Sequence, residues 1–427
     1  MNKLSQIRIC VIGLGYVGLP LAVEFGKKRS VIGFDRDNKR IQDLVNGYDK
    51  TNEVSSNEIK EASFLEFSSN EKNISDCNCY IICVPTPIDH DNKPDISILI
   101  EASKTVGKAL NKDDIVIYES TVYPGCTEDD CVPQLEIASG LKFNRDFFCG
   151  YSPERINPGD KINTIKNILK VTSGSNELVA DLVDNLYQEI ITAGTYKAES
   201  IKVAEAAKVI ENTQRDINVA FVNELSIIFN NLNIDTNAVL KAASTKWNFL
   251  SFRPGLVGGH CIGVDPYYLY SKSKEKGHKP RLISTARKIN NEMPKRVVKN
   301  LLKSLPSKNE ISVISKVLIM GFTFKENCSD FRNTKIIDLV QELEKNNIVV
   351  DIYDPIVDVN SVIHYHNVNI SNDKPKKDFY DAIIIAVAHS SFIDMGFSMV
   401  KSFTINNQGI IYDLKHIFDS SKTDLSL

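Results

Sequence analysis

Short apolar runs alternate with helical patterns over the first part of the chain. An apolar run at 7–12 is followed by spaced glycines, a helical pattern to about residue 28, and a second apolar run that ends at Asp35. The order strand, glycine turn, helix, strand is typical of a βαβ unit. Further apolar runs at 79–84 and 114–121 end in turn-prone or polar residues, as parallel strands do where they lead into ligand-binding loops. The pattern predicts a doubly wound domain.

The pattern changes between about residues 198 and 232, where the sequence contains neither proline nor glycine. Such a length favours one long helix of the kind that bridges domains or subunits. We expect a helical middle domain to begin here and to include the loop around Cys261.

The strand pattern returns after Pro306 and loosely repeats the order of the first domain. The runs at 316–324, 349–354 and 382–391 follow those of the first domain at offsets of roughly 300 to 320 residues. The fold class expected is α/β, with two doubly wound Rossmann-like domains joined by a helical middle domain. The expected boundaries are 1–199, 200–305 and 306–427, with a dinucleotide on the first domain and a phosphorylated ligand on the last.

Length and composition agree with a soluble protein of several domains. The chain has 427 residues, whereas single cores stop growing at about 250 to 300. A net charge of −3 without a long basic run argues against nucleic acid or an anionic membrane as partner. No apolar stretch has the length and character of a membrane span. Nine cysteines without zinc-like pairing favour free thiols in a reducing cytoplasm and no metal site.

Gly13, Gly15 and Gly18 match GxGxxG directly after a predicted strand and at the start of a helix. The first glycine allows the tight turn, the second admits a pyrophosphate, and the third lets helix and strand pack closely. Asp35 ends the next strand, where an acid hydrogen-bonds an adenosine ribose and repels a 2′-phosphate. These residues predict NAD rather than NADP, although the adjacent Arg36 weakens that preference.

The segment GGHCIGVD contains a cysteine in an unusual setting. A single cysteine is more often an inert, buried residue than a nucleophile. Gly258 and Gly259, however, permit backbone conformations that a packed strand does not need, and His260 and Asp265 indicate a polar, partly hydrated loop. Because a thiolate is a good covalent catalyst toward an aldehyde, Cys261 is a candidate nucleophile.

Other polar residues are unremarkable when each is taken alone. Lys208 and Asn212 lie four apart and share a helix face, which is usually a solvated stripe. The SPE sequence at 152–154 is normally read as a helix start. Thr121, Glu154, Lys325 and Arg332 are ordinary loop or surface residues by themselves.

Taken together and in order, several motifs resemble the UDP-glucose/GDP-mannose dehydrogenase family over nearly the whole chain. The segments SPERINPGD and FRPGLVGGHCIGVDPYYL resemble most the branch that acts on UDP-N-acetylhexosamines. The motifs are GLGYVG, VPTP (84–87), STVYPG (120–125), SPERINPGD (152–160), Lys208 with Asn212, FRPGLVGGHCIGVDP (252–266) and GFTFKENCSDFRN (321–333).

The resemblance implies a four-electron oxidation of the C6 alcohol of UDP-GlcNAc or UDP-GalNAc, with two NAD reduced in turn. NAD would lie on the N-terminal domain and UDP on the C-terminal one, with C6 at Cys261. Cys261 would form a thiohemiacetal and then a thioester that water cleaves. A cytoplasmic homodimer formed through the long helix, and a product destined for a surface polysaccharide, are implied in the same way.

The resemblance also assigns roles to single residues. Lys208 and Asn212 would stabilise the C6 oxyanion, Asp265 would transfer a proton, and Thr121 and Glu154 would position water, with Glu154 as base. Glucose-type members carry a second glutamate where this chain has Pro158, so that role is not transferred. The NAD contacts would be Gly13, Gly15, Tyr16, Val17, Gly18, Asp35, Arg40, Pro85, Thr86, Thr121 and Arg332. The substrate contacts would be Glu154, Arg155, Lys208, Asn212, Arg253, Gly258 and Lys325.

Three alternatives stay open at this point. The sugar could be UDP-ManNAc or UDP-glucose, the enzyme could be a simpler NAD-dependent dehydrogenase that removes one hydride, or the chain could bind nucleotide sugars without catalysis. The second leaves Cys261 and the second nucleotide-binding half without a function. The third leaves the cysteine, lysine, asparagine and aspartate together unexplained.

Overall fold

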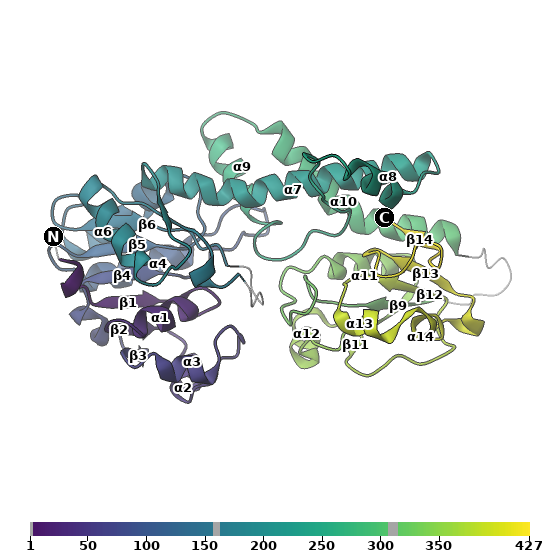
Figure 1. The fold of residues 1–427 in the computed structure, drawn as a ribbon, viewed down its shortest axis with the longest axis horizontal. Coiled ribbons are helices and arrows are strands. Elements are labelled where there is room, and N and C mark those ends of the chain that lie inside the picture. The colour runs from purple at the N-terminus through teal and green to yellow at the C-terminus, as the bar shows by residue number, and fades with distance from the viewer. Residues whose placement is uncertain (1–2, 157–162, 306–314) are drawn as a thin grey trace. The chain divides into compact units, whose positions relative to one another are not determined.

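The computed structural model describes residues 3–156, 163–305 and 315–427 (Figure 1). Its contacts divide the chain into two compact units. The first comprises Met1–Glu211 with Tyr267–Lys279, and the second comprises Asn212–Pro266 with Pro280–Leu427. The three boundaries expected from the sequence stay a prediction.

The first unit is built on a parallel sheet with the strand order β3-β2-β1-β4-β5-β6. Alternate residues of β1 enter two separate hydrophobic clusters, Ile9 and Val11 in one, and Cys10 and Ile12 in the other, so both faces of the sheet are covered. The strand order reverses between β1 and β4, which is where doubly wound sheets bind ligands. The strands are β1 (Ile9–Ile12), β2 (Val31–Phe34), β3 (Leu65–Ser68), β4 (Cys79–Ile82), β5 (Ile115–Tyr118) and β6 (Phe148–Tyr151).

Helices cover this sheet, and a small parallel pair of strands, β7 (Lys170–Thr172) and β8 (Thr195–Lys197), follows it. Residues 152–156 are not helical, so the usual interpretation of SPE as a helix start is wrong here. Instead, the Ser152 hydroxyl donates to the Val171 carbonyl at 2.7 Å. The helices are α1 (Gly18–Gly26), α2 (Asn38–Val45), α3 (Ser56–Glu61), α4 (Ser97–Ala109), α5 (Val132–Ser139) and α6 (Glu177–Gln188).

The long helix expected between about 198 and 232 is confirmed as α7 (Ile201–Asn231), drawn in teal in Figure 1. α8 (Thr236–Ala243), α9 (Asp265–Glu275) and α10 (Arg281–Ser304) follow it. In the second unit, buried polar side chains join α7 to α10. Arg287 pairs with Asp216 at 2.6 Å, and the Asn223 amide donates to Asn290 at 2.8 Å.

The second sheet is also parallel, with the strand order β11-β10-β9-β12-β13-β14, which is the order of the first sheet repeated. The expected fold class, two doubly wound domains and a helical middle region, is therefore confirmed. The strands are β9 (Lys316–Met320), β10 (Val349–Tyr353), β11 (Ile370–Ser371), β12 (Ala382–Ile385), β13 (Ile410–Asp413) and β14 (Leu425–Ser426), and the helices are α11 (Ile336–Lys345), α12 (Val359–His366), α13 (Ser390–Met395) and α14 (Phe397–Lys401).

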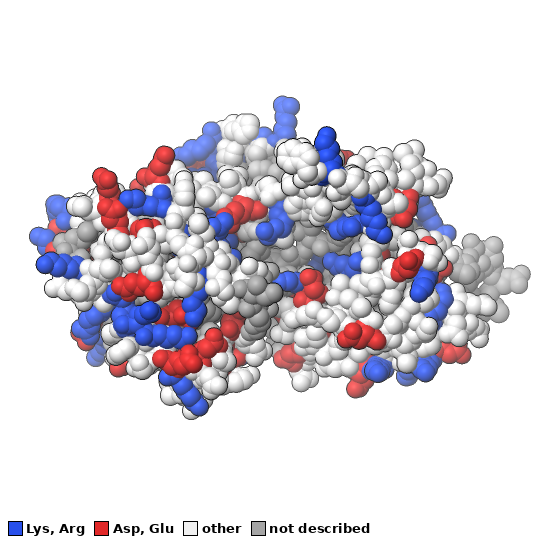
Figure 2. Space-filling model, viewed as in Figure 1, with Lys and Arg blue, Asp and Glu red and all other residues white. Residues whose placement is uncertain are grey.

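The surface carries charges of both signs. On the face shown in Figure 2, lysine and arginine side chains are interspersed with aspartate and glutamate over both units. In the described parts of the chain, every helix is too short or too polar to cross a membrane.

Candidate active site

The glycine turn after β1 leaves room for a ligand. Gly13 has a φ of +90°, which favours glycine, and a Cβ there would lie 3.0 Å from the Cys83 carbonyl oxygen. A Cβ on Gly18 would lie 1.8 Å from the Gly13 oxygen, so this glycine is required where α1 begins. A Cβ on Gly15 would meet no heavy atom within 4 Å. The space at Gly15 and the start of α1, next to the half-buried Tyr16 and Val17, fits a pyrophosphate.

Asp35 and Arg40 support this turn in different ways. Asp35 accepts the Leu14 N–H at 2.9 Å and the Asp37 N–H at 3.0 Å, and it stays half-buried. Arg40 is only 2% exposed, its Nε donates to the Leu14 carbonyl at 2.9 Å, and its Nη2 lies 2.8 Å from Asp49. Asp35 also lines a pocket and can therefore face a ligand, whereas the buried Arg40 supports the turn through the Leu14 carbonyl. A direct contact of Arg40 with NAD stays a prediction.

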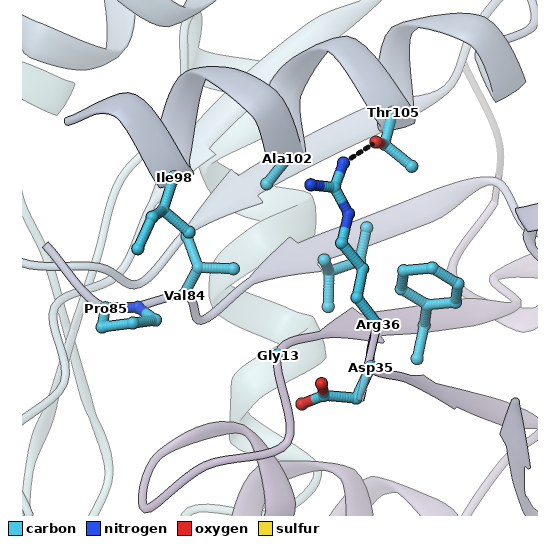
Figure 3. Close-up of a pocket in the computed structure, with 10 residues that line it drawn as sticks. Gly13, Asp35, Arg36, Val84, Pro85, Ile98, Ala102 and Thr105 are labelled. Carbon is cyan, nitrogen blue, oxygen red and sulfur yellow. Dashed lines mark hydrogen bonds between the residues drawn. The ribbon is translucent and has the colours of Figure 1, made fainter. Parts of the chain in front are cut away.

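A pocket lies between the end of β2 and helix α4 (Figure 3). Its wall is mostly apolar, and the Arg36 side chain extends to α4, where Nη2 donates to the Thr105 hydroxyl at 2.8 Å. A slot with apolar walls and one guanidinium fits an adenine ring. The lining residues are Ile12, Gly13, Phe34, Asp35, Arg36, Val84, Pro85, Ile98, Ala102 and Thr105.

The sequence motifs do not predict the α4 side of this pocket. Ile98, Ala102 and Thr105 follow each other at intervals of four and three residues, which places them on one helix face. That spacing, in the helix that follows the VPTP loop, is the signal that could have found them.

The loops after β4 and β5 are tied together in the first unit. The Thr86 hydroxyl donates to the Thr121 carbonyl at 2.7 Å, and the Tyr268 hydroxyl donates to the Thr86 carbonyl at 2.6 Å. The buried carboxylate of Glu205, on α7, accepts the N–H groups of Gly125 at 2.5 Å and Thr127 at 2.9 Å. These hydrogen bonds hold together the loops that carry the VPTP and STVYPG motifs.

Cys261 lies in a half-buried turn that leads into α9. Its carbonyl accepts the N–H groups of Val264 at 3.1 Å and Asp265 at 2.9 Å. Gly259, with a φ of +85°, donates to the Asn333 carbonyl at 3.1 Å, and a Cβ on Gly258 would lie 2.8 Å from the same oxygen. The glycines are needed because the Cys261 turn packs directly on the GFTFKENCSDFRN segment.

Two polar pairs accompany this turn in the second unit. The Asn212 amide donates to the Asp265 carboxylate at 2.6 Å, with both residues buried. Asp265 is therefore enclosed, in contrast to the hydrated loop that the sequence indicates. His260 Nε2 lies 3.3 Å from Asp330, so its imidazole also faces the neighbouring segment.

Lys208 and its neighbours form a separate cluster in the first unit. The buried Lys208 ammonium lies 4.0 Å from Glu154, whose other oxygen accepts the Ile156 N–H. Arg155 pairs with Glu211 at 2.7 Å and donates to the Leu169 carbonyl at 2.8 Å. Pro158 lies outside the described residues.

The remaining predicted residues lie in the second unit. Arg332 donates twice to Asp330, at 2.9 and 2.7 Å. Burial alone would raise the pKa of Asp330, but His260 and Arg332 outweigh burial and hold that pKa well below its usual range. Lys325 is half-buried, and exposed Arg253 donates to Asn237 on α8. The engagement of Arg332 by Asp330 leaves its contact with NAD a prediction.

Three domain models of one family match the chain in order. They are the NAD binding domain at residues 7–191, the central domain at 202–292 and the UDP binding domain at 318–420 of the UDP-glucose/GDP-mannose dehydrogenase family.

Full-length relatives agree with these matches. The chain is 56% identical to a UDP-N-acetyl-D-glucosamine 6-dehydrogenase of Pseudomonas aeruginosa, over 99% of this chain and 100% of that protein. It is also 56% identical to the enzyme of the same name from Salmonella typhi, over 100% of both chains. Among solved structures, a UDP-D-ManNAc dehydrogenase from Pyrococcus horikoshii superposes with a TM-score of 0.86 at 28% identity, covering 97% of this chain and 96% of that chain.

NAD is the cofactor of the N-terminal domain, and the chain is an NAD-dependent oxidoreductase of nucleotide sugars. The chain belongs to the UDP-glucose/GDP-mannose dehydrogenase family.

Proposed function

We propose that the protein oxidises the C6 alcohol of a UDP-N-acetylhexosamine, UDP-GlcNAc or UDP-GalNAc, to the carboxylate. Two NAD are reduced for each sugar. The two relatives at 56% identity, both named UDP-N-acetyl-D-glucosamine 6-dehydrogenase, support this choice of sugar. The observation that carries the chemistry is the buried Asn212–Asp265 hydrogen bond, because it fixes the carboxylate of a residue whose N–H donates to the carbonyl of Cys261, the candidate nucleophile.

NAD supplies the hydride acceptor in both oxidations. The turn of Gly13, Gly15 and Gly18 would hold its pyrophosphate, and Asp35 would accept from its adenosine ribose. Arg36 and α4 would enclose the adenine. Tyr16, Val17, Pro85, Thr86 and Thr121 would complete the contacts, with Arg332 and Arg40 as further candidates.

In the first oxidation, the C6 alcohol loses a hydride and a proton and becomes an aldehyde. The Lys208 ammonium and the Asn212 amide would stabilise the negative charge that develops on the C6 oxygen. Asp265 would accept the proton directly or through water. The UDP part of the substrate would be held by Lys325, with Arg155, Arg253 and Gly258 as further contacts.

In the second oxidation, the Cys261 thiolate adds to the aldehyde carbon and forms a thiohemiacetal. Loss of a second hydride leaves a thioester, and water then cleaves the C–S bond to give the carboxylate and the thiol. Glu154 would remove a proton from this water, with Thr121 positioning it. Covalent capture prevents the aldehyde from escaping before it is oxidised.

The exposed face of α7 would be covered in a homodimer, and the uronic acid product would enter polysaccharide synthesis. UDP-ManNAc is the second candidate substrate, because the Pyrococcus horikoshii protein with a TM-score of 0.86 is a UDP-D-ManNAc dehydrogenase.

The test is the amount of NADH formed from limiting UDP-GlcNAc with excess NAD, followed to completion. Two NADH per sugar are expected, and Cys261→Ala should abolish net oxidation to the uronic acid. One NADH per sugar in the wild-type protein would refute the thioester route. Parallel reactions with UDP-GalNAc, UDP-ManNAc and UDP-glucose test the sugar, and a much faster turnover of UDP-glucose would refute the preference for N-acetylated substrates.

A further inference from the structure

The second sheet repeats the glycine turn of the first. Gly13 and Gly321 each follow the first strand of their sheet, with φ of +90° and +95°. The N–H of each donates to the last residue of the adjacent strand, Phe34 or Tyr353, at 2.9 Å in both sheets. The turns are thus equivalent in backbone geometry although the second lacks the other two glycines.

The acid that ends the second strand is repeated as well. Asp35 accepts the Leu14 N–H at 2.9 Å, and Asp354 accepts the Phe322 N–H at 2.7 Å. Their exposure differs, since Asp35 is half-buried and lines the pocket of Figure 3, whereas Asp354 is 0% exposed. The carboxylate that faces a ligand site in the first sheet is closed off in the second.

The His389 side chain covers the Asp354 carboxylate. His389 is 0% exposed, and its Nε2 lies 3.1 Å from Asp354 and 3.3 Å from the Thr323 hydroxyl. Its Nδ1 accepts the Asn327 N–H at 3.0 Å. Because Nδ1 accepts, the proton of a neutral imidazole is on Nε2, which donates to Asp354. Asp354 is therefore connected through His389 to the loop that follows β9.

Asn327 fixes that loop a second time. It has a φ of +55°, its Oδ1 accepts the Ser390 N–H at 3.0 Å, and its Nδ2 donates to the Ser390 hydroxyl at 2.9 Å. At the other end of the segment, the Thr323 hydroxyl donates to the carbonyl of Lys325 at 2.8 Å. Lys325 thus lies in a short segment whose backbone is held on both sides.

We propose that Asp354, His389 and Asn327 are positioning residues that hold the Lys325 segment in the conformation that binds the diphosphate of the UDP-sugar. This inference rests on the proposed function, in which Lys325 contacts the UDP phosphates. A segment fixed before binding loses less conformational entropy when the ligand arrives. Asp35 would thus accept a hydrogen bond from a ribose in the first sheet, whereas its equivalent in the second sheet, Asp354, would help to position the phosphate-binding loop.

The experiment measures the dissociation constant of UDP alone by calorimetry in the full-length protein. Asn327→Gly keeps the backbone N–H and tolerates positive φ, but it removes both bonds to Ser390, so it tests the loop without disturbing the buried pair. His389→Gln keeps a donor toward Asp354 and loses the acceptor for Asn327. We expect both variants to weaken UDP binding about tenfold while NAD binding is unchanged.

His389→Asn can replace Nδ1 as acceptor but loses the donor toward Asp354, so it should also weaken UDP binding. Asn347→Gly, at an exposed position of the same unit that also has a positive φ of +57°, is the matched control and should leave UDP binding unchanged. Normal UDP binding by Asn327→Gly and His389→Gln, together with weakened binding by Lys325→Ala, would overturn the positioning role and leave the proposed function intact. An equal loss of NAD binding would also overturn it. Failure of the wild-type protein to bind UDP, or normal binding by Lys325→Ala, would instead refute the proposed function of this domain.

Discussion

At the residue scale, Asp35 supports the glycine turn and is also the residue that we propose selects the cofactor. Its two oxygens accept the N–H groups of Leu14 and Asp37, and the half-buried carboxylate lines the pocket of Figure 3. A 2′-phosphate placed there would meet a like charge, which costs several kcal/mol. The neighbouring Arg36 lines the same pocket.

Asp35→Asn should therefore relax the preference for NAD. The amide keeps an acceptor for Leu14 but removes the negative charge, so kcat/KM with NADP should rise about tenfold or more, while KM for NAD rises severalfold. Steady-state kinetics with both cofactors measure the change. Adding Arg36→Ala should remove the gain with NADP, and an unchanged NADP rate in Asp35→Asn would contradict the argument.

Glu205 gives the protein a pH-dependent stability. Burial raises the pKa of this carboxyl to about 7, although the N–H groups of Thr127 and Gly125 oppose the rise. Because the folded protein holds this proton more tightly than the unfolded chain, the contribution of Glu205 is fully present below about pH 4.5 and is lost as the pH rises to about 7. That loss corresponds to about 3 kcal/mol of unfolding free energy.

Glu205→Gln should flatten this dependence, since glutamine does not titrate. Denaturant unfolding at pH 5, 6, 7 and 8 should show the unfolding free energy of the wild-type protein falling more steeply with pH than that of the variant. Parallel curves for the two proteins would show that Glu205 does not carry the effect.

At the element scale, side chains that lie far apart in the sequence join helix α4 to the segment that follows strand β2. The Arg36–Thr105 hydrogen bond joins residues 69 positions apart and closes one wall of the pocket in which we propose that adenine binds. Without it, the guanidinium would lose its fixed place over the slot.

Thr105→Val keeps the shape of the side chain but removes the hydroxyl, so Arg36 should become mobile and KM for NAD should rise about two- to fivefold. KM for the UDP-sugar should not change. Ser103→Ala is the control, because this hydroxyl, also on α4, contacts Leu99 and Tyr118 instead of Arg36. An equal rise in both variants would indicate a general loosening of α4.

The strands and the long helix could be predicted from the sequence because their signals are local. Apolar runs, the spaced glycines and the absence of proline and glycine over α7 each lie within one element. The burial of Asp265 and Asp354 could not be predicted, because it depends on Asn212 and His389, which are distant in the sequence. The support that Arg40 gives to the glycine turn could not be predicted either, because it depends on contacts with Leu14 and Asp49.

At the scale of the whole molecule, α7 carries an exposed apolar stripe. Val203, Ile210, Phe221 and Ile228 are 45, 53, 53 and 44% exposed, and they follow each other at intervals that correspond to whole numbers of turns. A stripe of this kind on one helix face needs an apolar partner, and a second copy of the chain is the partner proposed here.

Phe221→Glu should therefore shift the protein from dimer to monomer, because the interface would have to bury an unpaired charge. Light scattering after size-exclusion chromatography measures the molecular mass. Asn230→Glu, at an exposed position on the opposite side of the same helix, should leave the mass unchanged. A wild-type protein that is already monomeric would refute the interface.

The first unit is discontinuous along the chain, since it includes Tyr267–Lys279 as well as Met1–Glu211. The returning segment is not a loose cover, because Tyr268 is fully buried and its hydroxyl reaches the carbonyls of Thr86 and Pro87. A protein fragment that ends at residue 199 would consequently lack Tyr268 and the hydrogen bonds that it makes to the VPTP loop. Recombination between relatives at residue 199 would replace the N-terminal domain but keep an α9 whose contacts are adapted to the original domain. We therefore expect α9 and the first 211 residues to be inherited together.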